Sequence, residues 1–173
     1  MAFKPFLSNK YMLNKLKWNI SELAKAMKIT EDEVREYFTD GRRVSFVLER
    51  RLAREVMHGK IAKSEGAGYD LTDNKGKKWE VRSITKRGVF FSPSNMVGKG
   101  RKFEKDGFLK KLDSIDGYIL VDVVNFPNVP FWKIKSNIVR KWWENGEIRK
   151  DTHSERESML KLIQTNCIQY TSK

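Results

Sequence analysis

The stretch GYDLTDNKGKKWEVRSIT, residues 68–85, predicts a β-hairpin around which the fold is built. Its two ends, 68–72 and 78–85, are typical of strands, and the residues between them are typical of a turn. Asp70 and Glu80 each lie five residues from Lys75, so we expect them to face one another, with Cβ atoms about 5 Å apart. Arg82 lies two residues beyond Glu80 and projects from the same face of its strand.

Two carboxylates this close repel one another unless a positive charge lies between them. A divalent cation that prefers oxygen ligands, above all Mg²⁺, supplies such a charge, and Asp70 and Glu80 are its candidate ligands. With Arg82 they form the arrangement that phosphodiester hydrolysis requires, in which a metal binds phosphate and activates water while a cation offsets developing negative charge. A surface hairpin with a cross-strand salt bridge is the alternative interpretation.

A further acid is expected to point toward this hairpin from the preceding helix. Residues 45–58 predict a helix with arginines on one face. The opposite, apolar face is expected to carry Phe46, Leu48, Leu52, Ala53, Val56 and Met57. Glu49 falls near the middle of the apolar face, where a lone carboxylate is costly unless it is paired or binds a metal. We therefore interpret Glu49 as a member of the site, the alternative being a buried ion pair with an arginine.

The remaining pattern predicts an α/β fold with a mixed sheet flanked by helices. Further strands are expected at 89–91, 116–124 and 129–135, and further helices at 101–112, 136–143 and 154–164. The three tryptophans of the C-terminal part are expected in the core or at an interface rather than stacked on bases; they are Trp132, Trp142 and Trp143.

Residues 1–43 are expected to form a helical segment similar to a helix-turn-helix, ahead of an α/β domain at 44–173. Asn19 and Thr30 each precede a glutamate by three residues, which is the pattern of a helix N-cap. Lys28 stands where the motif usually has a glycine. DNA contact, dimerisation and a purely structural helical hairpin all remain open for this segment.

The formal net charge of +13 and the pI near 9.8 favour a polyanionic partner, usually nucleic acid, over a merely soluble basic protein or one attracted to anionic membrane. No apolar run approaches the ~20 residues of a membrane span, and residues 1–5 have no signal-peptide core. Cys167 is the only cysteine, so no internal disulfide is expected, and two histidines with one cysteine do not make a standard zinc site. We therefore expect a cytoplasmic protein.

The run Asp70, nine residues, Glu80-Val81-Arg82, preceded by a helix with Glu49 and followed by an apolar strand, resembles the restriction-endonuclease-like PD-(D/E)xK nucleases. The resemblance covers residues 44–144. It implies a restriction-endonuclease-like fold in which Asp70 and Glu80 bind Mg²⁺ and Glu49 supports the site.

The chain departs from this family at the third motif position. The family has a lysine there that orients the attacking water, whereas Arg82 keeps the charge but cannot act as a general base. Lys78 and Lys86 are the nearby lysines that would substitute for it. Tyr69 also replaces the usual proline before the first acid.

In the resembled family, the segment after the catalytic strand often faces DNA. Here that segment has glycines that allow a phosphate to approach the main chain, cations that suit phosphates, and hydroxyl and amide groups that suit base edges. A flexible basic surface loop is the alternative. The candidate DNA-binding residues are Lys86, Arg87, Ser92, Ser94, Asn95, Lys99, Arg101 and Lys102.

From these patterns we expect a Mg²⁺-dependent endonuclease of the type II restriction kind, acting on double-stranded DNA at a short specific site. Asp70, Glu80 and Arg82 would be its catalytic residues, together with Glu49. Because one active site cuts one strand, a homodimer is the natural assembly. The alternatives are a monomeric nicking or repair endonuclease of the same fold, and a DNA-binding regulator that has lost catalysis at Arg82.

Overall fold

The computed structural model describes residues 14–96, 98 and 100–169. The strands are β1 (Lys15–Lys17), β2 (Lys60–Ile61), β3 (Leu71–Thr72), β4 (Lys78–Ile84), β5 (Val89–Phe90), β6 (Gly117–Asp122), β7 (Asn128–Lys135) and β8 (His153–Ser154). The α-helices are α1 (Ile20–Met27), α2 (Glu31–Thr39), α3 (Gly41–Arg51), α4 (Lys105–Ser114), α5 (Ser136–Glu144) and α6 (Arg156–Gln169). Short helical turns are η1 (Leu52–Val56), η2 (Glu65–Ala67), η3 (Ser94–Met96) and η4 (Val123–Asn125).

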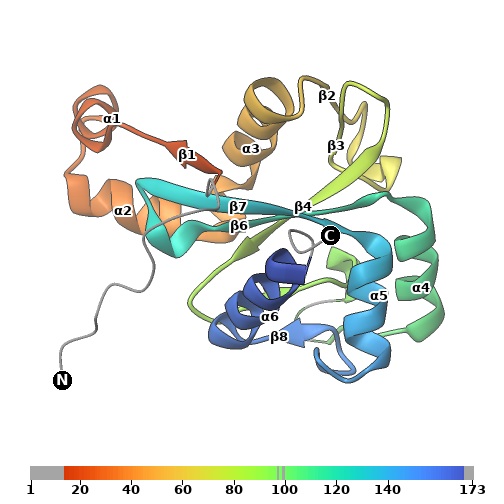
Figure 1. Ribbon diagram of the computed structural model, residues 1–173. Helices are drawn as coiled ribbons and strands as arrows, with labels where there is room; N and C mark the ends of the chain where they lie inside the picture. The colour runs from red at the N-terminus through yellow and green to blue at the C-terminus, as the bar shows by residue number, and fades with distance from the viewer. Residues whose placement is uncertain (1–13, 97, 99, 170–173) are drawn as a thin grey trace, which may run out of the picture.

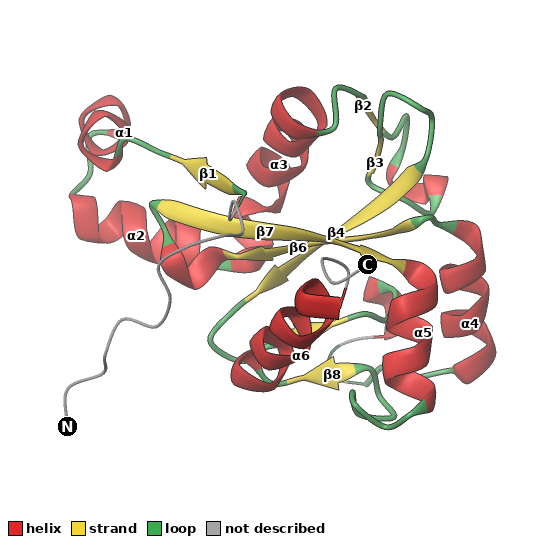
Figure 2. Ribbon diagram, viewed as in Figure 1, coloured by secondary structure: helices red, strands yellow, loops and turns green. Residues whose placement is uncertain are grey.

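The main sheet has the strand order β1-β7-β6-β4-β3-β2, and a separate pair joins β5 to β8. Strands β4 and β6 are parallel, whereas the other described pairs of the main sheet are antiparallel. Figure 1 shows the sheet in the middle of the molecule, with α3 on one side and α5 and α6 on the other. The helices and strands are distinguished by colour in Figure 2. The expected mixed α/β fold is therefore confirmed.

Strand β6 lies at the centre of the fold, and all of its residues are buried. Its side chains alternate between two hydrophobic clusters. Ile119 and Val121 pack with residues of α1, α2 and α3, while Tyr118 and Leu120 pack with residues of α4, α5 and α6. Because both faces are covered, the strand has a continuous apolar sequence, and this made it recognisable. Trp142 is buried in the second cluster, as expected for the core.

The N-terminal described segment begins with a strand, so the prediction of an entirely helical segment is wrong at β1. This strand pairs with β7 and buries only Leu16, and three residues are too few to reveal an alternating pattern. The two following helices begin as expected. The Asn19 side chain accepts the Glu22 N–H, and Thr30 forms a complete capping box. Lys28 joins the helices with φ 57°, so the turn has the left-handed geometry although it lacks glycine.

Helix α3 begins at Gly41 rather than at Ser45, because Asp40 caps it by accepting the N–H groups of Arg42 and Arg43. A Cβ at Gly41 would lie 2.6 Å from the Cβ of Ser83 in β4, so this close contact requires glycine. The helix then widens into the π-helical turn η1. The contact fixes α3 beside the strand that carries Glu80.

Other boundaries differ modestly from expectation. Strand β3 is shorter than the predicted 68–72, α4 begins at Lys105 rather than at 101, and α6 begins two residues later than 154. Strand β8 was not expected, because two residues carry no periodicity. No helix in the described ranges is long and apolar enough to cross a membrane.

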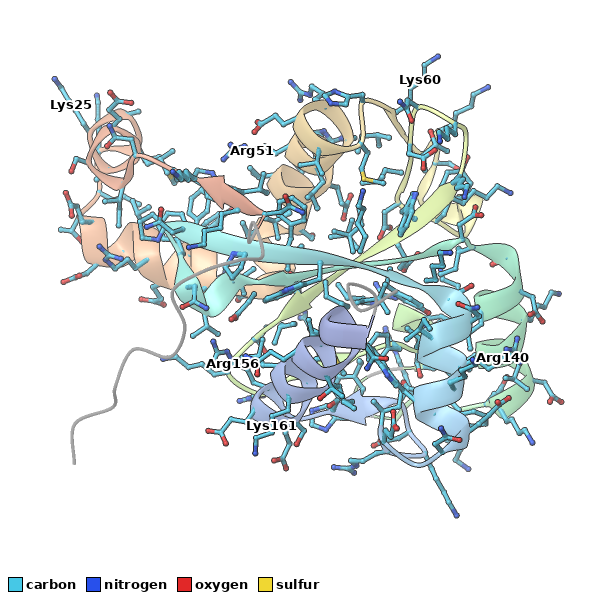
Figure 3. All side chains as sticks on the ribbon, in the orientation of Figure 1. Lys25, Arg51, Lys60, Arg140, Arg156 and Lys161 are labelled. Carbon is cyan, nitrogen blue, oxygen red and sulfur yellow. The ribbon has the colours of Figure 1, made fainter. Side chains whose placement is uncertain are left out.

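A buried ion pair joins the end of β6 to the start of α6. Asp122 is 1% exposed, and its Oδ2 accepts hydrogen bonds from Arg156 Nη2 at 2.7 Å and from Asn125 Nδ2 at 2.6 Å. Figure 3 labels Arg156 on α6. The pair therefore anchors the last helix to the central strand.

Arg156→Ala should lower the free energy of unfolding by about 2 kcal/mol, because it leaves the Asp122 carboxylate buried without its cation. We expect less than the roughly 3–5 kcal/mol typical of fully buried pairs, since the Arg156 side chain is 26% exposed. Urea unfolding followed by circular dichroism measures the change. Arg149→Ala is the control, because Arg149 is 65% exposed and its pair with Asp151 contributes little. Equal losses in the two variants would contradict the anchoring role of Arg156.

Candidate active site

The candidate site lies where β3 and β4 separate. The observed register of these strands, continued by one residue, places Asp70 opposite Glu80, as the hairpin symmetry predicted. The main chain of Asp70 is fixed on both sides, since its N–H donates to Trp79 O at 3.0 Å and its carbonyl accepts from Ala62 N at 2.9 Å. Its Oδ2 accepts the N–H of Val81 at 2.7 Å. The side chain therefore takes the place of a ladder carbonyl, and regular pairing ends there.

The side chains of β4 alternate between the two faces of the sheet. Trp79 and Val81 belong to the cluster with α3, whereas Ile84 belongs to the cluster with α4. Glu80 and Arg82 have the same parity as Ile84 and therefore project toward α4. The expectation that Glu80 and Arg82 share one face is confirmed.

Glu80 is 5% exposed, and two cations contact its carboxylate. Oε1 lies 2.7 Å from Nη2 of Arg82, and Oε2 accepts a hydrogen bond from Nζ of Lys111 in α4. Arg82 Nη2 also donates to Ser92 O at 3.2 Å, and Lys111 Nζ donates to Gly68 O at 2.7 Å. Both cations are thus held in place by main-chain carbonyls as well as by Glu80.

Lys111 was not predicted as a site residue. Lys78 and Lys86 were expected to supply the site's lysine, but both are exposed, and Lys78 Nζ lies 5.3 Å from the centre of the Tyr69 ring. Lys111 is distant in sequence, and no local motif links it to Glu80. A signal was nevertheless present, because Lys111 lies three residues after the buried Phe108 and four before the buried Ile115, where a cation needs a partner.

Glu49 and Asp70 are destabilised as anions in this setting. Burial, followed by the charge of Asp70, raises the pKa of Glu49 to about 7, although Arg50 opposes the shift. Burial, followed by the charge of Glu80, raises the pKa of Asp70 to about 6, against the N–H of Val81. The helix-wheel expectation that Glu49 points to the hairpin acids agrees with these interactions. The strand register therefore brings Asp70 and Glu80 together, and Glu49 lies within range of their charges.

Tyr118 of β6 lies close to these charges and was not predicted as part of the site. Burial raises the pKa of its hydroxyl above the ordinary value, with the charges of Glu80 and Asp70 acting in the same direction. The hydroxyl donates to Phe91 O at 3.0 Å. Tyr118 is therefore a neutral side chain that excludes water from one side of the site.

The donor set suits a hard divalent cation. Three carboxylates, those of Glu49, Asp70 and Glu80, stand against the two cations Arg82 and Lys111, so one negative charge is in excess when all five are ionised. Among the described residues, no three His, Cys, Asp or Glu side chains are already arranged as a metal site. Mg²⁺ commonly uses only one or two carboxylates and completes its shell with water and substrate oxygens, so Asp70 and Glu80 fit as its protein ligands.

The segment proposed to contact DNA is divided by the structure. Ser92 is corrected: it is buried, and its hydroxyl is hydrogen-bonded to that of Thr152, so it does not reach base edges. The side chain of Ser94 and the whole of Lys99 lie outside the described residues. The remaining candidates are exposed and stay predictions; they are Lys86, Arg87, Asn95, Arg101 and Lys102.

The helix-turn-helix-like unit has an acidic second helix. The first turn of α2 contains Glu31, Asp32 and Glu33, and Glu36 is also exposed. In DNA-binding units of this kind the start of the second helix enters the major groove, between phosphates. Its negative charge therefore argues against DNA reading by α2, and the buried Val34 of the same helix joins the core shared with the sheet.

Comparison of the chain with models of known protein families finds no match, and no curated protein matches it. The side-chain geometry described above therefore carries the functional argument.

Glu49→Gln should stabilise the protein at alkaline pH in the presence of EDTA. A carboxyl whose folded-state pKa is raised contributes stability that is fully present below its ordinary pKa of about 4.5 and is lost as the pH rises through about 7. Glutamine never ionises, so the variant should exceed the wild type at pH 8 and match it near pH 4.5. Because the Glu49 side chain is only half-buried, we expect a gain on the order of 1 kcal/mol in the free energy of unfolding.

Glu55→Gln, in the turn that follows α3, is the matched control. Its hydrogen bond from Arg51 lowers the pKa of Glu55, so the same substitution should bring no gain at pH 8. Thermal melts of both variants at pH 4.5 and pH 8 measure the difference. A Glu49→Gln melting temperature equal to that of the wild type at both pH values would show that the pKa of Glu49 is not raised in the folded protein.

Proposed function

We propose that the protein is a Mg²⁺-dependent deoxyribonuclease of the restriction-endonuclease-like kind. Its substrate is double-stranded DNA, cut at a short specific site by a homodimer that supplies one active site to each strand. The observation that carries the proposal is the cross-strand pair Asp70 and Glu80, with the part-buried cations Arg82 and Lys111 on Glu80 and the charge of Glu49 within range.

The bound metal would polarise the phosphate and lower the pKa of a coordinated water. Asp70 and Glu80 supply its carboxylate ligands, and Glu49 adds negative charge that favours a cation. The guanidinium of Arg82 contacts the Glu80 carboxylate and can also donate a hydrogen bond to a non-bridging phosphate oxygen. Hydrolysis adds water across one P–O bond, so the leaving oxygen must gain a proton.

Lys111 can take the part that Arg82 cannot. An ammonium group is a compact charge with three rotatable N–H donors, whereas a guanidinium is a rigid planar fork. The Lys111 side chain is 10% exposed and contacts Glu80 directly, so it lies beside the proposed metal ligand. We therefore assign orientation of the attacking water to Lys111, and charge stabilisation to Arg82.

A basic groove supports a polyanionic partner. It lies at the turn end of the β3–β4 hairpin and has a volume of about 570 Å³. Four lysines outnumber two acids in its lining; these residues are Lys75, Lys77, Lys133 and Lys135, with Asp73 and Asp116. None of the four lysines forms a salt bridge with any described residue. Unpaired lysines in a groove favour phosphates, which release counterions when they bind.

A DNA-binding protein without catalysis is the second candidate. It is favoured by one observation, namely that both oxygens of Glu80 are already occupied by Arg82 and Lys111. If that pairing persists with DNA and Mg²⁺ present, Glu80 is a structural ion pair. Cleavage of a supercoiled plasmid separates the possibilities, since linear product indicates double-strand cutting, open circles indicate nicking, and no product at any Mg²⁺ concentration overturns the enzyme.

Asp70→Asn should abolish plasmid cleavage while DNA binding, measured by fluorescence anisotropy, stays the same or becomes tighter. The variant keeps the shape of the side chain but removes an anionic ligand and a charge that repels phosphate. Asp113→Asn is the control, because Asp113 is an exposed acid paired with Arg140 on the surface. Wild-type cleavage by Asp70→Asn would refute this site.

Lys111→Met should lower the single-turnover cleavage rate by roughly 10²-fold or more, the usual cost of removing one positioned donor from an active site. Lys111→Arg keeps the charge but not the compact ammonium geometry, so recovery by arginine would mean that charge alone matters. Lys110→Met is the neighbouring control, since Lys110 is exposed. A rate for Lys111→Met equal to that of Lys110→Met would remove Lys111 from the mechanism.

A further inference from the structure

One face of α3 carries an exposed aromatic ring among arginines. Phe46 is 61% exposed, more than any other large apolar side chain in the described part of the chain. Arg42 lies four residues before it, Arg50 four residues after it, and Arg54 four residues further. Residues at this spacing line one side of a helix, so the four side chains form a continuous row, here called the α3 stripe.

The contacts of the stripe hold the Phe46 ring in place and leave one of its sides uncovered. The guanidinium carbon of Arg50 lies 3.3 Å from the centre of the Phe46 ring, and Arg50 Nη1 donates to Phe46 O at 3.2 Å. Arg50 covers one side of the ring, so the large exposure of Phe46 comes from its other side and its edge. A groove of about 460 Å³ runs along this surface and is lined by Phe46, Val47, Arg50, Arg51, Arg54 and Glu55.

The arginines of the stripe form no salt bridge with a described residue, although the charges of Arg50 and Arg54 act on the neighbouring Glu49 and Glu55. Arg51 pairs with Glu55, and Arg43 pairs with Asp40. Within the described ranges, Arg42, Arg50 and Arg54 form no salt bridge. Figure 3 labels Arg51 beside α3, where its Nη1 donates to Lys17 O of β1, so that arginine serves the fold instead.

Charge and shape together identify the partner. Three unpaired guanidinium groups attract phosphates, and a ring with one free side can stack on a base. In a duplex the bases are already stacked inside, so only an unpaired nucleotide offers such a face. A second copy of this face is a poorer partner, because a symmetric contact would bring the arginines of one stripe against those of the other.

We propose that the α3 stripe binds an unpaired segment of nucleic acid, with phosphates on the arginines and a base on the free side of Phe46. Glu49 is adjacent to Arg50 on the same helix and lies at the candidate active site, so the bound strand leads to that site. This last step rests on the proposed function, whereas the binding itself does not. In that case the enzyme holds an unpaired segment beside the double-stranded DNA that it cuts.

Fluorescence anisotropy with a labelled single-stranded oligothymidine and a duplex of equal length tests this binding, with EDTA present to prevent cleavage. Phe46→Ala should weaken binding of the single strand by about tenfold, the loss of one base–aromatic stack, and change duplex binding by less than about twofold. Phe46→Trp should restore single-strand binding. Tyr37→Ala, which removes an exposed aromatic from α2, should leave both unchanged.

Single-strand binding by Phe46→Ala at the wild-type level, with circular dichroism confirming the fold, would overturn the inference. So would an equal loss for both DNA forms. Sedimentation of the wild type and of Phe46→Ala tests the other occupant, because a dimer lost only in the variant would make the stripe a self-interface. The proposed function fails separately, if Asp70→Asn still cuts DNA, and that outcome leaves the binding measurements intact.

Discussion

The rest of this structure depends on the ion pairs of the buried Glu80 carboxylate. A carboxylate that is 5% exposed must be neutralised, and Arg82 and Lys111 do this from two different elements. Lys111 can reach Glu80 only if α4 packs against this face of the sheet. Arg82 donates a hydrogen bond to the carbonyl of Ser92. The N–H of Ser92 in turn donates to the hydroxyl of Thr152, which directly precedes β8. One charge thus links the hairpin, α4 and the last strand pair.

This arrangement divides the acids of the site into two kinds. Glu80 has its charge balanced by two cations, whereas Asp70 and Glu49 have raised pKa values because burial and their neighbours disfavour the anion. The uncompensated negative charge therefore lies on the side of Asp70 and Glu49. A divalent cation held by Asp70 would relieve this repulsion.

The parts of this site that share a local pattern were predictable from the sequence, and the part that depends on tertiary contact was not. The turn at 73–76 fixes the hairpin register, so Asp70 and Glu80 were correctly placed opposite one another. Glu49 was found because helical periodicity assigns it to a buried face. Lys111 was missed because β5 and a long loop separate it from β4, and Ser92 was misassigned because its partner, Thr152, is 60 residues away. Strands β1 and β8, with three and two residues, are too short to carry any periodic signal.

Helix α3 connects the chemistry of the site to the surface of the molecule. Its buried side packs Val44 and Leu48 into the core, another side presents Glu49 to Asp70, and the exposed side carries the α3 stripe. The contact between Gly41 and Ser83 fixes the start of the helix on β4, and the π-helical turn η1 ends it. On the proposed function, a rigid helix would keep phosphates bound by the stripe at a constant distance from the acids, which positioning a scissile bond requires. The acidic surface of α2 would repel the same phosphates and direct a strand bound on α3 away from α2.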